Sequence, residues 1–337
     1  MKRMAVLLVI CLMALAVAAS LPAQAPKKLV LAMAVTPPNL VHIPPYLAKD
    51  LGYFKEEGLD VEIVSFEGGV GSLRAMMAGS ADLSLTSGDP PILARVQGSP
   101  LKMIVSTSPR LEAVMTVQGS IKDVKDLKGK KIGIQEPSGF ADLFSRRLLT
   151  QAGIKPEEVQ IISTSTAGRV PALVTGQVDT GVLHVEQAIR AIKRNPNLRN
   201  VVNFWEVFPD AFYNVIVANE KVLKEKPDAV EGFVRAVIKA DRYLYRNKRG
   251  ALDAAVEFTG YTLEEIEPAF DQLIKGRVWS VNDGLSRRMV DFSIDNLVKI
   301  GRIPPDKKPS YEQVVDLGPA NAALKTLGKW TDDPGWL

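Results

Sequence analysis

Residues 81–106, ADLSLTSGDPPILARVQGSPLKMIVS, hold two β-type runs with a helical run between them. The runs at 81–87 and 101–106 are rich in Leu, Ile, Val, Thr and Ser, which is typical of short strands. The segment between them begins with Pro90 and Pro91, a pair that suits the first turn of a helix. A strand, a helix and a second strand in this order predict a βαβ unit.

The same alternation continues on both sides of this unit, so we predict an α/β fold. It forms two series, one before residue 107 and one from 130 to 205, and the pattern turns helical from Pro227 onward. The predicted strands are 28–34, 59–66, 81–87, 101–106, 130–135, 159–163, 180–184 and 201–205. The main predicted helices are 44–52, 70–78, 90–97, 140–152, 170–175, 186–193, 227–246, 248–259, 262–274 and 286–300.

The two series are related in sequence at an offset of 97 residues, although two helix–turn–strand units can also match by chance. The offset places Ala75-Met76-x-x-Gly79-x-x-Asp82 on Ala172-Leu173-x-x-Gly176-x-x-Asp179, Ser87 on His184 and Asp89 on Glu186. In open α/β sheets ligands bind beyond the carboxyl ends of the strands. Two such lobes facing each other predict a cleft lined by strand-to-helix turns.

Composition excludes several classes of function. The chain has 337 residues, 46% of them apolar and 24% charged, which is enough for two lobes with real cores. Its 42 Lys and Arg against 38 Asp and Glu are too evenly balanced for a nucleic-acid partner. One Cys and two His exclude a Cys/His zinc site and a disulfide framework, so no metal is expected.

The first 25 residues predict a signal peptide. Lys2 and Arg3 precede an apolar run at 4–19, and small residues stand at Ala23 and Ala25. We therefore expect cleavage after Ala25 and export to the periplasm. An uncleaved anchor is the alternative, but the run is short for a bilayer.

Candidate ligand contacts in the first lobe lie at the strand-to-helix turns: His42, Ser87 and Asp89. Ser87 ends a predicted strand and is the better candidate, whereas Asp89 is expected mainly to cap the next helix. The glycine-rich turn at 68–72 precedes a helix and could direct free N–H groups at an anion, or it could be a plain flexible turn.

Candidate contacts in the second lobe follow the same logic: Ser138, Gly139, Phe140, Arg169, His184 and Glu186. Gly139 would let a ligand approach the backbone, and Arg169 could offer its planar guanidinium to a carboxylate or sulfonate. His184 beside Glu186 suggests acid–base chemistry, but without a nucleophile or a metal constellation a binding or structural role is favoured. The aromatic residues 205, 208, 212 and 213 are expected to form hinge core.

Several longer motifs carry a family resemblance. They are Pro45-Tyr46-Leu47-Ala48-Lys49-x-x-Gly52-Tyr53-Phe54, Ala78-Gly79-x-Ala81-Asp82-Leu83, Pro90-Pro91-Ile92-Leu93-Ala94 and Val124-Lys125-Asp126-Leu127-Lys128-Gly129-Lys130-Lys131-Ile132-Gly133. In these the chain resembles the periplasmic solute-binding proteins of ABC importers, specifically the SsuA-like group that binds alkanesulfonates, taurine, nitrate and thiamine-type pyrimidines. The resemblance covers most of the chain after the leader.

The resemblance implies a two-lobe, type 2 periplasmic-binding-protein (venus-flytrap) fold with a cleft between the lobes. Lobe 1 would comprise 26–112 and 213–337 and lobe 2 would comprise 113–212, with crossovers near 109–113 and 208–214. It further implies a monomer that captures a small polar or anionic solute and delivers it to a membrane permease and its ATPase. No ligand can be chosen within the group, because fold analogy does not specify a ligand.

Two other functions compete with this reading. Eukaryotic thiamine-pyrimidine synthases, which use pyridoxal phosphate, resemble the same family, but the leader and the absence of their Cys-rich motif argue against an enzyme. No Gly-x-Ser-x-Gly, His-Glu-x-x-His or Walker A motif occurs, so we predict no catalytic residue and no cofactor. A sensor domain would need a transmembrane helix fused to the chain, and no later segment is apolar enough.

Overall fold

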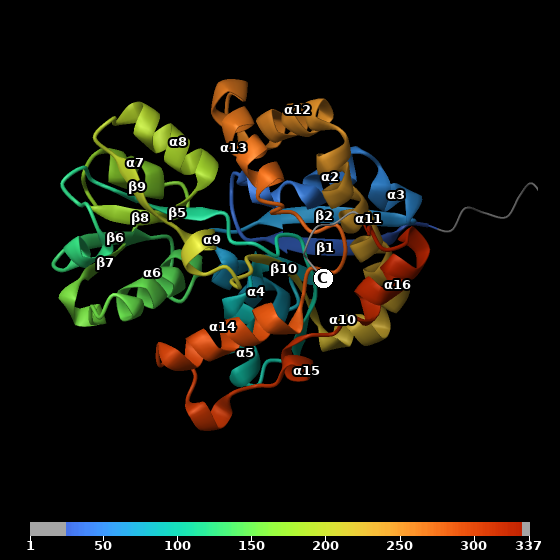
Figure 1. Cartoon of the computed structure of the whole chain (residues 1–337). Helices are drawn as coiled ribbons and strands as arrows, with labels where there is room; N and C mark the ends of the chain where they lie inside the picture. Colours follow the sequence, from blue (N-terminus) through green and yellow to red (C-terminus); the bar gives the residue numbers. More distant parts are fainter. Residues whose placement is uncertain (1–24, 332–337) are drawn as a thin grey trace, which may run out of the picture.

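The computed structural model describes residues 25–331 and contains two five-stranded sheets, each at the centre of one lobe (Figure 1). The first sheet has the order β2-β1-β3-β10-β4. Its strands are β1 (Lys27–Met33), β2 (Leu59–Ser65), β3 (Leu83–Ser87), β4 (Leu101–Ser106) and β10 (Asn214–Asn219). Strand β10 runs antiparallel to both of its neighbours, and the other pairings are parallel.

The second sheet repeats this arrangement in the order β7-β6-β8-β5-β9. Its strands are β5 (Ala113–Val117), β6 (Lys131–Ile134), β7 (Gln160–Ser163), β8 (Thr180–His184) and β9 (Arg199–Asn203). Strand β5 is the antiparallel member here. The α/β prediction is therefore confirmed, and the second lobe lies on the left in Figure 1.

The internal repeat is visible in both lobes. Asp82 accepts a hydrogen bond from the Val30 N–H at 2.9 Å, and Asp179 accepts one from the Lys131 N–H at 2.8 Å. Each aspartate thus ties the start of its strand to the neighbouring parallel strand at matching positions. The offset of 97 residues reflects two lobes of the same construction.

The chain crosses between the sheets twice. The first connection, 107–112, joins β4 to β5, and the second leads from β9 to β10 through α9 (Phe204–Val207). In each sheet the antiparallel strand is the one that directly follows a crossover from the other lobe. Both connections lie near the predicted crossovers, while the lobe boundaries at 112 and 212 stay a prediction.

Strands β5 and β10 and the end of β9 differ from the sequence prediction. Neither 113–117 nor 214–219 was among the predicted strands, and the strand expected at 201–205 ends at Asn203. Phe204 begins a helical turn instead, closed by the Phe208 N–H on the Phe204 carbonyl at 2.7 Å. Burial of Phe204 against Phe144 holds this turn in the core.

Helices pack on both sheets. Before residue 195 these are α2 (Pro44–Asp50), α3 (Tyr53–Glu56), α4 (Gly69–Met77), α5 (Asp89–Val96), α6 (Phe140–Gln151), α7 (Arg169–Val174) and α8 (Val185–Arg194). Then come α10 (Glu220–Glu225), α11 (Pro227–Arg246), α12 (Lys248–Thr259), α13 (Leu263–Lys275), α14 (Arg287–Lys299), α15 (Tyr311–Val314) and α16 (Gly318–Leu327). Glycines with positive φ follow the ends of α4, α5 and α6, a common arrangement at helix C-termini.

The long helix α11 anchors the C-terminal helices to the first lobe. Its buried face includes Phe233, which stacks on Phe54 with ring centroids 5.1 Å apart. Within residues 25–331 no helix is long and apolar enough to cross a membrane. Residues 1–24 of the predicted leader, including Cys11, lie outside the described residues.

Candidate functional site

The two lobes touch along a seam at the carboxyl ends of their strands. A short 3₁₀ helix of the first lobe, Leu40–His42, reaches the start of α8 in the second. There the Leu40 N–H donates to Glu186 Oε1 at 3.2 Å, and Gln187 Nε2 donates to Asn39 Oδ1 at 3.1 Å. Bonds of this kind across the seam show that the structure is closed.

A set of buried side chains, here called the interlobe cluster, lies on this seam. It consists of His42, Glu112, Phe140, Arg169, His184, Glu186 and Tyr213. The ring of Phe140 stacks on His184 with centroids 5.4 Å apart and an interplanar angle of 12°. His42 meets His184 edge to face at 5.7 Å. The cluster combines residues from both lobes and from both crossovers.

His184 is the best-connected member of the cluster. Its Nδ1 bonds to a carboxyl oxygen of Glu112, and its Nε2 lies 3.3 Å from the Tyr213 hydroxyl. The second carboxyl oxygen of Glu112 accepts from the Val185 N–H at 3.3 Å. Glu112 therefore bonds both to the side chain of His184 and to the first amide of α8.

Burial determines the charges in the cluster. It lowers the pKa of His184 to about 3, lowers that of His42 well below its usual value, and raises that of Glu112 well above its usual value. Burial and the neighbouring Glu112 together raise the pKa of Glu186 to about 7. Both imidazoles are then neutral at pH 7, and burial favours the protonated form of Glu112. Arg169 is the fixed charge of the cluster.

Several polar atoms along this seam have no hydrogen-bond partner among the described residues. They are Asn39 Nδ2, both ring nitrogens of His42, Arg169 Nε, Glu186 Oε2 and Asn214 Oδ1. Buried polar groups in proteins are nearly always bonded, so a group of them in one place calls for an explanation. Beside them a cavity of about 220 Å³ opens between the lobes, with Asn39 and Gln187 in its wall.

Five predicted site residues come together in this cluster: His42, Phe140, Arg169, His184 and Glu186. Ser87 ends β3 and pairs in the sheet with Asn214, whose side chain donates to the Val41 carbonyl at 3.3 Å. Ser87 thus lies on the side of the first lobe that carries the interlobe cluster. Whether these residues contact a ligand stays a prediction.

Asp89 does not play the role that the sequence predicted. It lies inside α5, whose N-cap is Gly88, and it caps nothing with its side chain. Its carboxylate instead accepts from Arg147 Nη2 on α6 at 2.7 Å. Both side chains are buried, so this is an ion pair between the lobes, away from the interlobe cluster.

Ser138 and Gly139 directly precede the cluster residue Phe140, and their printed contacts are to residues outside the cluster. Ser138 Oγ accepts a hydrogen bond from Arg302, and its own side chain does not cap α6. A Cβ built at Gly139 would lie 2.7 Å from Glu136 Cγ. The close neighbour that requires glycine here is therefore Glu136.

Glu136 also explains the glycine-rich turn before α4. Its carboxylate accepts from the Val70 N–H at 2.9 Å, and further bonds come from the amides of Gly69 and Gly71. A Cβ at Gly68 would overlap this carboxylate. The predicted anion-binding helix end thus holds an anion, and that anion is a carboxylate of the opposite lobe.

Sequence reasoning missed Glu112 and Tyr213. Glu112 stands between apolar residues inside the predicted first crossover, and a carboxylate in such a stretch is the signal that could have revealed it. Tyr213 was assigned to hinge core with the other aromatic residues. Phe204 and Phe208 do pack there against Phe144, but the Tyr213 hydroxyl faces His184.

Comparison with known proteins identifies the family. Residues 39–251 match the family described as NMT1/THI5 like. The chain belongs to the NMT1/THI5-like family. A Brucella abortus protein that carries a provisional name as a binding protein is 27% identical over 278 residues, which are 79% of this chain and 84% of that one.

Two further comparisons, one with a sequence and one with a solved structure, follow. A 4-amino-5-hydroxymethyl-2-methylpyrimidine phosphate synthase of Saccharomyces cerevisiae is 24% identical over 238 residues, 66% of this chain and 68% of that one. The structure of the alkanesulfonate-binding protein SsuA from Xanthomonas axonopodis superposes with a TM-score of 0.71 at 19% identity, covering 87% of this chain and 99% of that one. The predicted resemblance and the type 2 binding-protein fold are confirmed. In residues 25–331 no three His, Cys, Asp or Glu side chains form a possible metal site.

The raised pKa of Glu186 predicts a pH-dependent stability. Its folded-state pKa of about 7 exceeds the ordinary 4.5, so its contribution to the free energy of unfolding falls as pH rises between these values. Glu186→Gln keeps an oxygen for the Leu40 N–H and cannot ionise. We expect the variant to gain up to about 3 kcal/mol over wild type at about pH 8 and little at about pH 4, measured by urea unfolding.

The matched control is Glu264→Gln on α13, whose side chain is 79% exposed. It should leave the pH profile unchanged. If the free energy of unfolding changed equally with pH in wild type and in Glu186→Gln, Glu186 would ionise as freely in the folded as in the unfolded protein.

The carboxylate of Glu136 predicts a contribution to lobe closure. Glu136→Ala removes the bonds to the α4 amides and should lower the ratio of closed to open protein by about fivefold to tenfold, as expected for one hydrogen-bonded carboxylate. Glu136→Gln keeps an acceptor and should stay mostly closed. Residues 25–331 hold no Cys, so spin labels at Asp60→Cys and Glu157→Cys can report the interlobe distance.

Added formate offers a control for this variant. It should restore closure of Glu136→Ala by occupying the amides of α4, and it should not affect wild type. An interlobe distance in Glu136→Ala equal to that of wild type would contradict the role of this contact.

Proposed function

We propose that this protein is the solute-binding component of an ABC importer, and that it holds a small polar or anionic solute at the interlobe cluster. The family membership supports this assignment, as does the SsuA-type fold. The named binding-protein relative agrees with it over most of both chains. In this proposal the solute is enclosed when the two lobes close and is released when they open.

The observation that carries the proposal is the group of unpartnered polar atoms buried between the lobes. Asn39 Nδ2 and Arg169 Nε can only donate, Glu186 Oε2 and Asn214 Oδ1 are acceptors in their ionised or amide forms, and neutral His42 can do both. A polar molecule placed among them would satisfy groups that otherwise carry a desolvation penalty. Binding energy and closure would then be coupled through the same contacts.

The electrostatics favour a solute with negative or partly negative groups. Both imidazoles are neutral at pH 7, and the guanidinium of Arg169 is a cation within the cluster. An anionic group would therefore be stabilised by this charge in a region of low dielectric. The neighbouring cavity of about 220 Å³ suits a small molecule and supplies the opening between the lobes.

The cellular setting follows from the same proposal. The predicted leader and the binding-protein relatives support a periplasmic location, with a permease and its ATPase as partners. We propose a monomer, because one chain supplies both walls of the seam. Catalysis is not required, and the solute should be recovered unchanged.

The test combines solute identification with two variants. Native mass spectrometry of protein taken from its own periplasm identifies the bound solute, and calorimetry measures its affinity. His42→Phe removes two unpartnered nitrogens and keeps a ring, so solute affinity should fall about tenfold to hundredfold while the apo protein stays as stable as wild type. Arg169→Met should lower the affinity for an anionic solute by at least as much.

Arg249→Met is the matched control, because the Arg249 side chain on α12 is 81% exposed. It should bind like wild type. Unchanged affinity in both His42→Phe and Arg169→Met would place the solute elsewhere. A solute that is chemically converted during incubation would favour the alternative, an enzyme like the pyrimidine phosphate synthase relative.

A further inference from the structure

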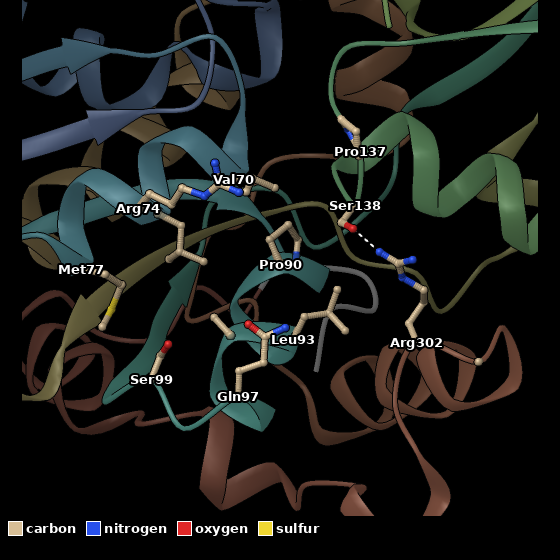
Figure 2. A pocket seen from close by; sticks show the side chains of 13 residues that line it. Val70, Arg74, Met77, Pro90, Leu93, Gln97, Ser99, Pro137, Ser138 and Arg302 are labelled. Atoms are coloured by element: carbon tan, nitrogen blue, oxygen red, sulfur yellow. Dashed lines mark hydrogen bonds between the residues drawn. The ribbon is translucent and has the colours of Figure 1, made fainter. Parts of the chain in front are cut away.

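A second and larger pocket lies on the seam, apart from the interlobe cluster. It has a volume of about 580 Å³ and shares no residue with the cluster. Figure 2 shows its walls, formed by α4 and α5 of the first lobe, the turn at Pro137 and Ser138 of the second, and Arg302 after α14. Its volume falls within the range of small-molecule sites.

The base of the pocket is apolar. Leu73 and Met77 of α4 and Pro90 and Leu93 of α5 line it side by side. Leu73 and Pro90 are buried, and Met77 and Leu93 are half-buried. Such a base would favour a hydrocarbon or ring system over a fully hydrated ion.

The charges in the pocket have one sign. Arg74 and Arg302 line it, and none of its described lining residues is acidic. Figure 2 shows the two arginines on opposite sides, with Pro90 and Leu93 between them. Arg302 donates to Ser138 Oγ across the seam, so this guanidinium already connects the two lobes.

Glu136 is the acidic group that the charge of Arg74 acts on. Its carboxylate, however, is bonded to the Val70 N–H and is not part of the pocket wall. The positive charge of Arg74 is therefore only partly compensated and remains available at the rim.

We propose that this pocket is a second binding site, for an elongated organic dianion with an apolar body and an acidic group at each end. The body would lie on Pro90, Leu93 and Met77, and the acidic groups would meet Arg74 and Arg302. Because the walls belong to both lobes, an occupant also joins them and favours the closed form. The site does not depend on which solute binds the interlobe cluster.

Calorimetry with three probes of equal chain length tests the site on the full chain: octanedioate, octanoate and 1,8-octanediol. Octanedioate should bind at one site and about fivefold more tightly than octanoate, since each exposed ion pair adds a modest increment. The diol should bind more weakly than octanoate. Arg74→Gln and Arg302→Gln should each reduce octanedioate to the affinity of octanoate, while Arg249→Gln should have no effect.

His42→Phe distinguishes this site from the interlobe cluster. Octanedioate affinity should be unchanged in that variant, even where the affinity for the importer solute falls. Equal affinities for octanedioate and octanoate, or no loss in either pocket arginine variant, would overturn the proposal. A loss of octanedioate binding in His42→Phe would also overturn it, because the dianion would then occupy the cluster.

Discussion

Burying ionisable groups between two lobes is the constraint on which this structure depends. His42, His184, Glu112, Glu186 and Arg169 lose water when the seam closes, and burial shifts each pKa toward the neutral form. Several of their buried polar atoms have no hydrogen-bond partner among the described residues. The cost of burying these groups keeps the closed form from being strongly favoured by itself. A polar occupant that bonds to them would offset this cost, so opening and closing would depend on binding.

The chain's own carboxylates take the helix ends that usually attract anions. Glu136 bonds to the first amides of α4 across the seam, and Glu112 bonds to the first amide of α8 beside the hinge. Two positive helix ends are thereby used for closure and for holding His184, not for the solute. Recognition is left to side chains, among which Arg169 carries the fixed charge. This division explains how helix-end chemistry can bring the lobes together while the ligand specificity lies elsewhere.

The fold was largely predictable, because its periodicities are local. The helices at 227–246 and 248–259 match the structure residue for residue, and the offset of 97 residues anticipated the repeated sheet. Strand β5 was missed because it follows a crossover and joins its sheet antiparallel, which no local pattern reveals.

The site was only partly predictable. Turn positions identified His42 and His184, but Glu112 and Tyr213 lie on the crossovers, and their contacts depend on how the lobes meet. Asp89 shows the same limit, since its partner Arg147 lies on the other lobe.

The most direct measurement is a crystal structure of the protein with the solute that native mass spectrometry identifies. We expect closed lobes with the solute in contact with Arg169 and His42, and with hydrogen bonds to atoms such as Glu186 Oε2 that have no partner among the described residues. A solute bound on the outer surface of one lobe, with the interlobe cluster packed as it is here, would contradict it.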